Sequence, residues 1–269
     1  MLLIIFFSIL MSQTSNCISE ELIFERSLYE IGDTLSIEDQ NILFPICNGS
    51  GNYETGDYFS FSDFNGNFNN EYKISIISMN ATWWPACYEY ISLMDELIEF
   101  INEDDRLEFI ISLDYSSNEN DLYSCSEWAN LYSELGDYGN NPLILDTDPD
   151  YYIWNMFAGN TYSAYAFLDH NMVLRYKFDM PNLYDFQYVY IPSIIDEMYG
   201  CIDPSACNYD IGSVYDDGSC LYTGCLNDPS AINYGGPGSG VVPTVTNDDG
   251  SCITAVTGCT DPTAFNYDA

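Results

Sequence analysis

The strongest constraint on the fold is a stretch in which an apolar run leads through a short turn into an amphipathic helical pattern. Residues Ile74–Met79 form the run, and Ala81-Thr82-Trp83-Trp84-Pro85-Ala86-Cys87 forms the turn. After the turn, apolar side chains recur at helical spacing, at Ile91, Leu93, Met94, Leu97, Ile98 and Ile101. We therefore predict a buried strand, a tight turn and a helix whose amphipathic pattern runs from Tyr88 to Ile101, with Cys87 in the first turn of the helix.

This layout resembles the active-site segment of secreted thioredoxin-like and redoxin proteins, which carry a W-C-P-P-C box between a central strand and a helix. Trp84 stands where that family has its attacking cysteine, and only the second cysteine of the box, Cys87, is present. Ser163, six residues before Asp169, stands where the family has the cis-proline that guides peptide substrates. The resemblance therefore implies a thiol-disulfide site that has lost both its nucleophile and its substrate guide.

A peroxidase of the same superfamily would need a threonine three residues before the cysteine and an arginine nearby. Position 84 is tryptophan, and residues 159–167 hold no arginine. The second cysteine of such a box is usually buried, which raises its pKa and disfavours the reactive thiolate. The sequence therefore disfavours a peroxidase.

The surrounding segments match the element order of the same family. Phe59, Phe61 and Phe64 alternate like a strand before an Asn-Gly turn, as in the opening hairpin of redoxins. We expect further strands at 107–113, 142–146, 164–169 and 172–178, and helices at 128–135 and 191–199. The implied fold class is α/β: a thioredoxin fold, with a central mixed sheet flanked by helices, an N-terminal β extension and a small disulfide-stapled repeat tail.

The tail is recognised by a short motif that repeats after residue 199. Gly200-Cys201-Ile202-Asp203-Pro204 recurs at 224–229 and 258–262, and the first two copies close with Asp-Asp-Gly-Ser-Cys at 216–220 and 248–252. The motif resembles the GCTDPxAxNY…DDGSC repeats that exported bacterial proteins carry in tandem. The third copy stops at Ala269 before its closing motif, so we expect the sequence to be a fragment.

These features divide the chain into a signal peptide (1–12), an N-terminal extension (13–55), a thioredoxin-like domain (56–199), two repeats (200–223 and 224–257) and a truncated third repeat (258–269). The apolar start is too short to span a bilayer. A lipoprotein anchored through Cys17 is the alternative, and no later segment is predicted to cross a membrane. Ten cysteines fit an oxidising compartment, so we predict a secreted, periplasmic or cell-surface protein.

The charge of the chain excludes whole classes of partner. Forty-two acidic residues stand against five basic ones, for a net charge of −37. Because nucleic acids and anionic lipids are bound mainly through Lys and Arg, neither is expected as a partner. Divalent cations suit such a surface, and calcium in the repeats is the one cofactor that the sequence suggests.

Among the four cysteines outside the repeats, the sequence suggests two candidate pairs. Cys17 and Cys47 bracket the N-terminal extension and could form a disulfide. Cys87 and Cys125 form the candidate redox pair, because a loop after the next strand could bring Cys125 to the site. A plain structural disulfide between them is the alternative.

The repeats are too small to bury a core and therefore need covalent support. The natural pairs are Cys201–Cys220 and Cys225–Cys252. Cys207 stands where the other copies have Ile232 and Phe265, so we expect a small buried hydrophobe there. Oxygen ligands of the kind that calcium prefers come from Asp203, Asn208, Asp210, Asp216 and Asp217. The alternative is that these side chains cap turns of their own backbone.

Two functions remain open. One is a thiol-disulfide oxidoreductase that uses Cys87 with Cys125 and acts on protein thiols or disulfides. The other is a non-catalytic thioredoxin-fold domain of a surface-associated protein, whose repeats serve as spacers or bind cell-surface components. His170, the only histidine, is expected to be a solvated turn residue without a catalytic role.

Overall fold

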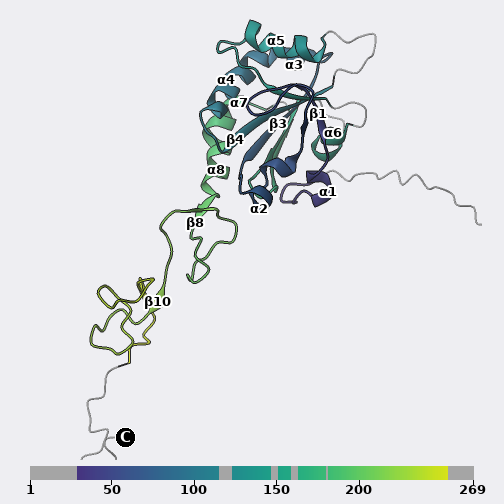
Figure 1. Ribbon diagram of the computed structural model, residues 1–269. Coiled ribbons are helices and arrows are strands. Elements are labelled where there is room, and N and C mark those ends of the chain that lie inside the picture. Colours follow the sequence, from purple (N-terminus) through teal and green to yellow (C-terminus); the bar gives the residue numbers. More distant parts are fainter. Residues whose placement is uncertain (1–28, 115–122, 147–150, 159–162, 180, 254–269) are drawn as a thin grey trace, which may run out of the picture.

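The computed structural model describes residues 29–114, 123–146, 151–158, 163–179 and 181–253. The expected signal peptide, Cys17 and the truncated third repeat lie outside these residues. The domain is built on one seven-stranded sheet, whose strands are β1 (Phe44–Asn48), β2 (Tyr58–Phe59), β3 (Ile74–Ala81), β4 (Leu107–Asp114), β5 (Leu143–Asp146), β6 (Ala164–Leu168) and β7 (Leu174–Asp179). Their order across the sheet is β2-β1-β5-β4-β3-β6-β7 (Figure 1).

The pairing of the strands defines the fold. β3 pairs in parallel with β4 over its whole length, and β4 pairs in parallel with β5. On the other side of β3, β6 and then β7 pair antiparallel. Three parallel strands with an antiparallel hairpin added at the central strand make a thioredoxin fold, so the predicted fold class is confirmed. β1 and β2 extend the sheet beyond β5 by antiparallel pairing, as the predicted N-terminal β extension.

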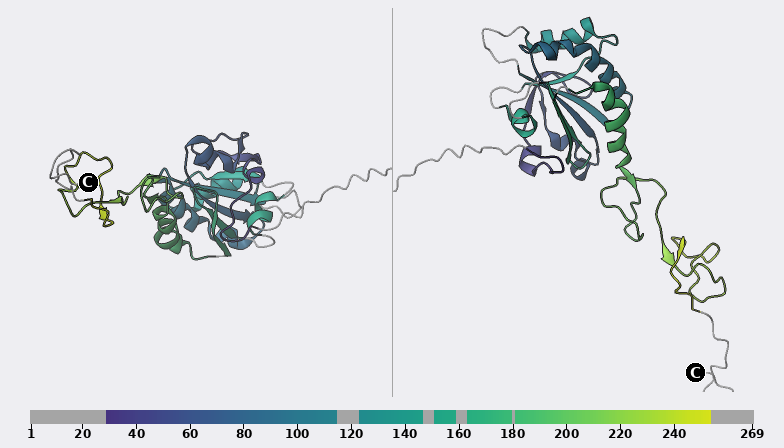
Figure 2. Two further views of the ribbon diagram at one scale, coloured as in Figure 1. Left: turned by 90° about the horizontal axis from the view of Figure 1, so that it is seen from below. Right: turned by 180° about the vertical axis from the view of Figure 1, so that it is seen from behind.

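Helices cover both faces of the sheet (Figure 2). One apolar cluster contains Ile74 and Ile76 of β3, and the other contains Ile77 and Met79, because alternate side chains of a strand point to opposite faces. The first face is covered by α3 (Pro85–Glu89), α4 (Ile91–Asn102), α5 (Cys125–Leu135), α7 (Leu183–Asp185), the π-helix η2 (Phe186–Tyr190) and α8 (Ile191–Asp196). The second face is covered by the 3₁₀-helix η1 (Phe61–Phe64) and α6 (Tyr152–Phe157). The short helices α1 (Ile37–Gln40) and α2 (Gly66–Asn69) contact η1.

The strand and Asn-Gly turn predicted around Phe59, Phe61 and Phe64 are correct only as far as Phe59. Strand β2 ends at Phe59, and η1 follows at once. A capping box explains the change, since Ser60 and Asp63 satisfy each other's backbone at the start of a helical turn. Phe59, Phe61 and Phe64 still meet in the core, with ring centroids 5.3 and 5.4 Å from Phe59 to the other two.

The helices also differ from the prediction at several boundaries. The helix expected from Tyr88 divides at Tyr90, which ends α3 and precedes α4. The last helix begins earlier than expected, as a π-helix at Phe186, and its regular part ends at Asp196. α1, α2, α6 and α7 were not predicted, because helices of three to six residues are too short to show a periodic pattern.

Both predicted pairings of the domain cysteines are wrong. Cys47 is bonded to Cys125 across 78 residues, which excludes a Cys17–Cys47 bond and a Cys87–Cys125 redox pair. The reason is the position of β1, which pairs with β5 and contacts α5. Cys47 near the end of β1 therefore lies beside Cys125 in the first turn of α5, with the two Cα atoms 6.1 Å apart.

Removing this disulfide is expected to destabilise the domain. The double variant Cys47→Ala/Cys125→Ala frees a long loop in the unfolded chain, which costs roughly 4 kcal/mol of unfolding free energy on the chain-entropy account. Urea unfolding followed by tryptophan fluorescence measures the loss. The matched control is Cys201→Ala/Cys220→Ala, which removes a tail disulfide and should leave the domain transition unchanged. An equal effect of the two double variants would contradict the prediction.

The tail leaves the domain at the end of α8 and runs away from the sheet (Figure 1). Each repeat has one pair of two-residue parallel strands: β8 (Tyr199–Gly200) with β9 (Tyr215–Asp216), and β10 (Thr223–Gly224) with β11 (Asn247–Asp248). The disulfides Cys201–Cys220 and Cys225–Cys252 join the pairs that the repeat spacing predicts. In the part of the chain that the structure describes, no helix has the length and apolar character needed to cross a membrane.

Cys207 does not have the predicted role of a buried hydrophobe. Its thiol is exposed and makes no disulfide, with Sγ 3.2 Å from Thr223 Oγ1. Ile232, at the same position in the second repeat, is also exposed. The repeats have so little interior that this position lies on the surface in both copies.

Candidate functional site

The site begins where β3 ends. Trp84 caps the N-terminus of α3, Pro85 occupies the first helical position, and Cys87 lies in the first turn, with its N–H donating to the Trp84 carbonyl at 3.0 Å. Proline suits this position because its fixed φ matches the helix and it has no N–H that would need a partner. The predicted placement of Cys87 after the central strand is therefore observed.

Cys87 lies in the core rather than at the surface. Its side chain is fully buried, and the free thiol belongs to the larger apolar cluster. Sγ is 3.0 Å from Ser163 Oγ, and the Ala81 N–H donates to Sγ at 3.4 Å. Burial raises the pKa of the Cys87 thiol, and these two contacts lower it by less. The neutral thiol is therefore the favoured form.

Ser163 does face the cysteine, as its alignment with the cis-proline position predicts. It is buried at the start of β6, and its φ is +58°, in the left-handed region. Proline cannot adopt this conformation, because its ring holds φ near about −65°. A Ser163→Pro substitution would therefore not restore the guide that the family resemblance implies.

Aromatic side chains close to Cys87 in the sequence, Trp84 and Tyr88 among them, reach the surface. Trp84 is 38 % exposed and meets Trp83 edge to face at 6.1 Å. The Trp83 indole N–H and the Tyr151 hydroxyl each donate to the buried Asp114 carboxylate at 3.2 Å. Tyr88 stacks on Tyr123 with ring centroids 5.9 Å apart. An indole cannot attack a disulfide, so the exposed position of the box offers contact area and no nucleophile.

Among the described residues, the site has no second thiol to exchange with. Cys125, the proposed partner, is engaged with Cys47, and the remaining free cysteine within the residues described, Cys207, lies in the tail. Thiol-disulfide exchange requires a thiolate that attacks and a partner that resolves the mixed disulfide. The described residues at this site supply neither an attacking thiolate nor a thiol to resolve a mixed disulfide.

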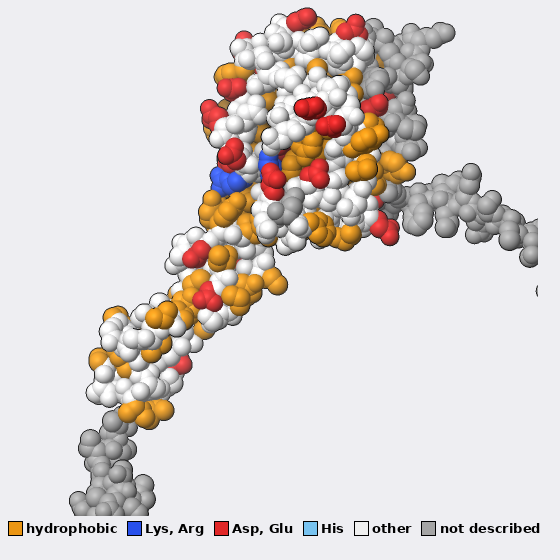
Figure 3. Space-filling model, viewed as in Figure 1, with side chains coloured by type: hydrophobic (Ala, Val, Ile, Leu, Met, Phe, Trp, Pro, Cys, Tyr) orange, Lys and Arg blue, Asp and Glu red, His pale blue; other side chains and the backbone are white. Residues whose placement is uncertain are grey.

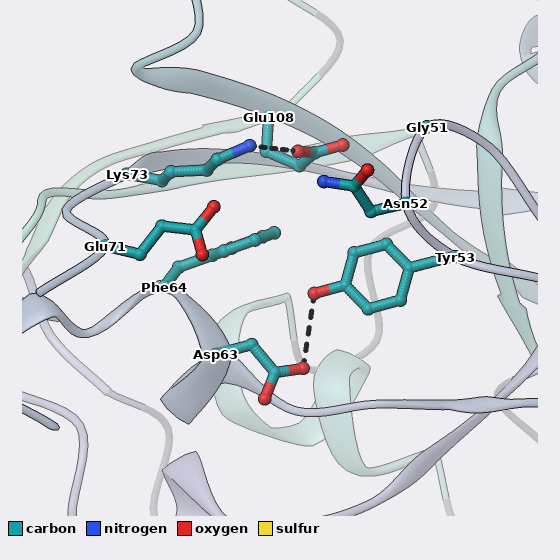
Figure 4. A pocket seen from close by; sticks show the side chains of 8 residues that line it. All are labelled: Gly51, Asn52, Tyr53, Asp63, Phe64, Glu71, Lys73 and Glu108. Atoms are coloured by element: carbon teal, nitrogen blue, oxygen red, sulfur yellow. Dashed lines mark hydrogen bonds and ion pairs between the residues drawn. The ribbon is translucent and has the colours of Figure 1, made fainter. Parts of the chain in front are cut away.

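A cavity of about 400 Å³ lies at the opposite end of β3, away from Cys87 (Figure 4). Its lining residues come from four separate segments: Gly51, Asn52, Tyr53, Asp63, Phe64, Glu71, Lys73 and Glu108. Lys73 Nζ pairs with Glu108 at 3.0 Å and lies 5.2 Å from the centre of the Phe64 ring. The Tyr53 hydroxyl donates to Asp63 at 3.2 Å. No sequence pattern pointed to this cavity, and its lysine is already paired with one of its carboxylates.

The Lys73–Glu108 pair predicts a pH-dependent loss of stability in Lys73→Met. Burial raises the pKa of Glu108 and Lys73 opposes this, so the substitution raises that pKa further. The unpaired carboxylate then costs about 2 kcal/mol at pH 7, below the range for a fully buried pair because both side chains keep partial exposure. Below the usual glutamate pKa of 4.5, Glu108 is protonated in both the folded and the unfolded protein, so the cost disappears.

Urea unfolding of Lys73→Met at pH 7 and at pH 4 tests this sign. The control is Lys73→Met/Glu108→Gln, which removes the carboxylate and should recover most of the loss at pH 7. An equal loss at both pH values would contradict the electrostatic account.

His170 is not the solvated turn residue that the sequence predicts. It follows β6 in the expected turn, but its ring is 1 % exposed. Nε2 is 2.8 Å from the carbonyl oxygen of Gly212 in the first repeat, and the ring meets Tyr72 edge to face at 6.1 Å. Sequence reasoning missed this because the covering group lies 42 residues away.

The proposed calcium ligands lie in hydrogen-bonded turns. Asp203 accepts from the Ser205 N–H and the Tyr222 hydroxyl, and these bonds lower its pKa. Asn208 bridges the end of the repeat by donating to the Ser219 carbonyl. The remaining three, Asp210, Asp216 and Asp217, accept from backbone N–H groups two residues ahead.

These bonds are those of the turn-capping alternative. Within the described residues, no three acidic, histidine or cysteine side chains are grouped so as to hold a metal ion. Calcium binding by the repeats stays a prediction.

No family model matches the chain, and no curated protein matches it either. Several solved structures resemble it. A secreted Mycobacterium tuberculosis disulfide oxidoreductase homologous to E. coli DsbE is 13 % identical, with a TM-score of 0.40 over 57 % of this chain and 96 % of its own. The exposed lipoprotein thioredoxin Etrx1 of Streptococcus pneumoniae is 17 % identical, with a TM-score of 0.39 over 58 % and 98 %.

The mitochondrial 2-Cys peroxiredoxin of Plasmodium falciparum is 17 % identical, with a TM-score of 0.43 over 62 % of this chain and 94 % of its own. These likenesses are distant, and the fold follows from the strand order and pairing described above.

Burial predicts a clear difference between the two free cysteines of the described residues, Cys87 and Cys207. We expect alkylation of the native protein at pH 8 to modify Cys207 and to leave Cys87 intact, because Cys87 is inaccessible and its raised pKa keeps it neutral. After denaturation both should react. Peptide mapping by mass spectrometry distinguishes the two sites. Modification of native Cys87 at the rate of Cys207 would contradict the placement of Cys87 in the core.

Proposed function

We propose that this chain is a non-catalytic thioredoxin-fold protein that carries a repeat array outside the cytoplasm. The observation that supports this most strongly is that an indole, that of Trp84, stands at the N-cap of α3, while Cys87 is buried and has no second thiol beside it among the described residues. The fold is kept, while the two groups that thiol-disulfide exchange requires are missing. The aromatic surface at Trp84, Tyr88 and Tyr123 is suited to contact rather than to bond exchange.

Export is supported by the covalent chemistry of the chain. Three disulfides join cysteines in the domain and in both described repeats, and such bonds persist in oxidising compartments. A net charge of −37 disfavours nucleic acid and anionic membrane surfaces as partners. Acidic side chains are scattered over the face of the domain in Figure 3, while the few basic ones in view lie close together. The repeats, as spacers or as binding modules for cell-surface components, then provide the extended part of the protein.

The decisive experiment compares wild type with Trp84→Cys. The substitution gives a C-P-A-C box, with the new thiol at the N-cap of α3, where the helix dipole favours a thiolate. We expect no insulin-disulfide reduction above the uncatalysed rate for wild type, and measurable reduction for Trp84→Cys under the same reductant. Trp84→Ser is the matched control, since it removes the indole without adding a thiol and should stay inactive.

Wild-type turnover would overturn the proposal, and two further variants would locate its source. Loss of that activity in Cys87→Ser would assign it to the buried thiol. Loss in Cys47→Ala/Cys125→Ala would assign it to the domain disulfide instead.

A further inference from the structure

Each described repeat is held at its start by the same pair of backbone hydrogen bonds. In the second repeat, the carbonyl of Tyr222 accepts from the N–H groups of Thr246 and Asn247 at 2.9 and 3.0 Å. The parallel pairing of β10 with β11 continues directly from these bonds. Tyr222 belongs to the end of the first repeat, so the second repeat is built on a carbonyl that its predecessor supplies.

The first repeat has the same arrangement, but the carbonyl comes from the domain. Met198 accepts from the N–H groups of Val214 and Tyr215 at 2.9 and 3.0 Å, and the pairing of β8 with β9 follows. Met198 is fully buried in the larger core cluster, and its own N–H donates to the Ile195 carbonyl of α8. The carbonyl of Met198, just after α8, therefore plays the same part for the first repeat as the carbonyl of Tyr222 plays for the second.

The domain adds side-chain contacts at this junction. The carbonyl of Gly212 can only accept, so His170 donates to it through Nε2–H at 2.8 Å, and the Asn171 amide donates to it at 3.2 Å. The Nδ1 atom of His170 is buried without a hydrogen-bond partner among the described residues. The ring is thus oriented by its bond to the repeat. The Val214 side chain packs against the domain core.

A second contact fixes the strand that starts the repeat. Arg106, next to β4, donates to the Tyr199 hydroxyl at 2.7 Å, and its guanidinium lies 5.7 Å from the centre of that ring. Tyr199 also packs against Tyr215, with ring centroids 5.2 Å apart. The first repeat therefore contacts the β6–β7 turn, the end of α8 and the start of β4.

We propose that the thioredoxin-fold domain is the capping unit of the repeat array, and that the surface formed by Met198, His170, Asn171 and Arg106 is a docking site for the first repeat. In repeat proteins most stability comes from contacts between neighbours, and the first unit needs a cap in place of a predecessor. The repeats here have almost no core of their own, so this need is strong. The domain provides that predecessor and fixes the direction in which the array leaves it (Figure 2). This role is independent of any chemistry at Cys87.

Hydrogen exchange on the full chain tests the proposal. In wild type, the amides of Val214 and Tyr215 should be protected to a degree similar to those of Thr246 and Asn247. His170→Phe/Asn171→Ala keeps an aromatic ring against Tyr72 and removes both donors to Gly212. We expect exchange at Val214 and Tyr215 to become about tenfold faster, as the loss of one to two net hydrogen bonds predicts. Exchange at Thr246 and Asn247 should not change.

Asn227→Ala is the matched control, because it removes a side-chain amide that bonds to Asp248 within the second repeat. It should accelerate exchange in the second repeat only. Val214→Ser provides a second route: it removes the packing from the repeat side and leaves the domain sequence intact, and it should accelerate exchange at Tyr215. Unchanged exchange at Val214 and Tyr215 in His170→Phe/Asn171→Ala, or unprotected wild-type amides there, would overturn the proposal.

Residual dipolar couplings give a readout that does not depend on a variant. If the domain caps the array, the amide couplings of the first repeat fit the alignment tensor of the domain. A separate, weaker alignment of the first repeat would show that it moves independently and would refute the docking site.

Discussion

The parallel pairing of β3 with β4 is the contact on which the rest of the domain depends. It joins eight residues of each strand, and every residue of β3 is buried because helices cover both faces of the sheet. The two apolar clusters meet on opposite sides of this strand. Lys73, which lines the cavity, directly precedes β3, and Trp84 and Cys87 follow its C-terminal end. The position of both features is thus set by one strand.

At Cys87, two physical effects act in opposite directions. The N-terminus of a helix favours a thiolate, typically by about 0.3 to 1 kcal/mol in an exposed setting. Complete burial in an apolar cluster disfavours the charged form by up to several pKa units. Burial is therefore the larger effect, in agreement with the raised pKa of the thiol. The N-cap of α3 is the more exposed position at this helix end, and it is occupied by Trp84, which has no thiol.

The sequence was sufficient for the fold and for the position of the degenerate site, because both depend on local patterns. Buried strands and an amphipathic helix around a fixed turn can be read from spacing alone. The disulfide between Cys47 and Cys125 could not, since it depends on β1 pairing beside β5, a contact between distant segments. Phe59 and Phe61 fit strand spacing, whereas Phe61 and Phe64 fit helical spacing, and the capping by Ser60 and Asp63 decided between the two.

The burial of His170 shows a different limit. A turn between two strands is normally solvated, and only the return of the chain 42 residues later covers this ring.

In the tail, by contrast, contacts within each repeat explain why the two copies share certain residues. Gly200 and Gly224 precede the first cysteine of each repeat, and a Cβ at Gly224 would lie 2.9 Å from Val245 Cγ2. At Gly200 the corresponding neighbour is Ser213.

The amide of Asn208 and that of Asn233 each donate at 2.8 Å to the carbonyl of the serine before the closing cysteine. Such short-range bonds make the repeats recognisable in sequence, but they leave each unit with little buried surface. A repeat whose conformation is set by short-range bonds, and which buries little surface, depends on its neighbour for stability. For the first repeat, that neighbour is the end of α8.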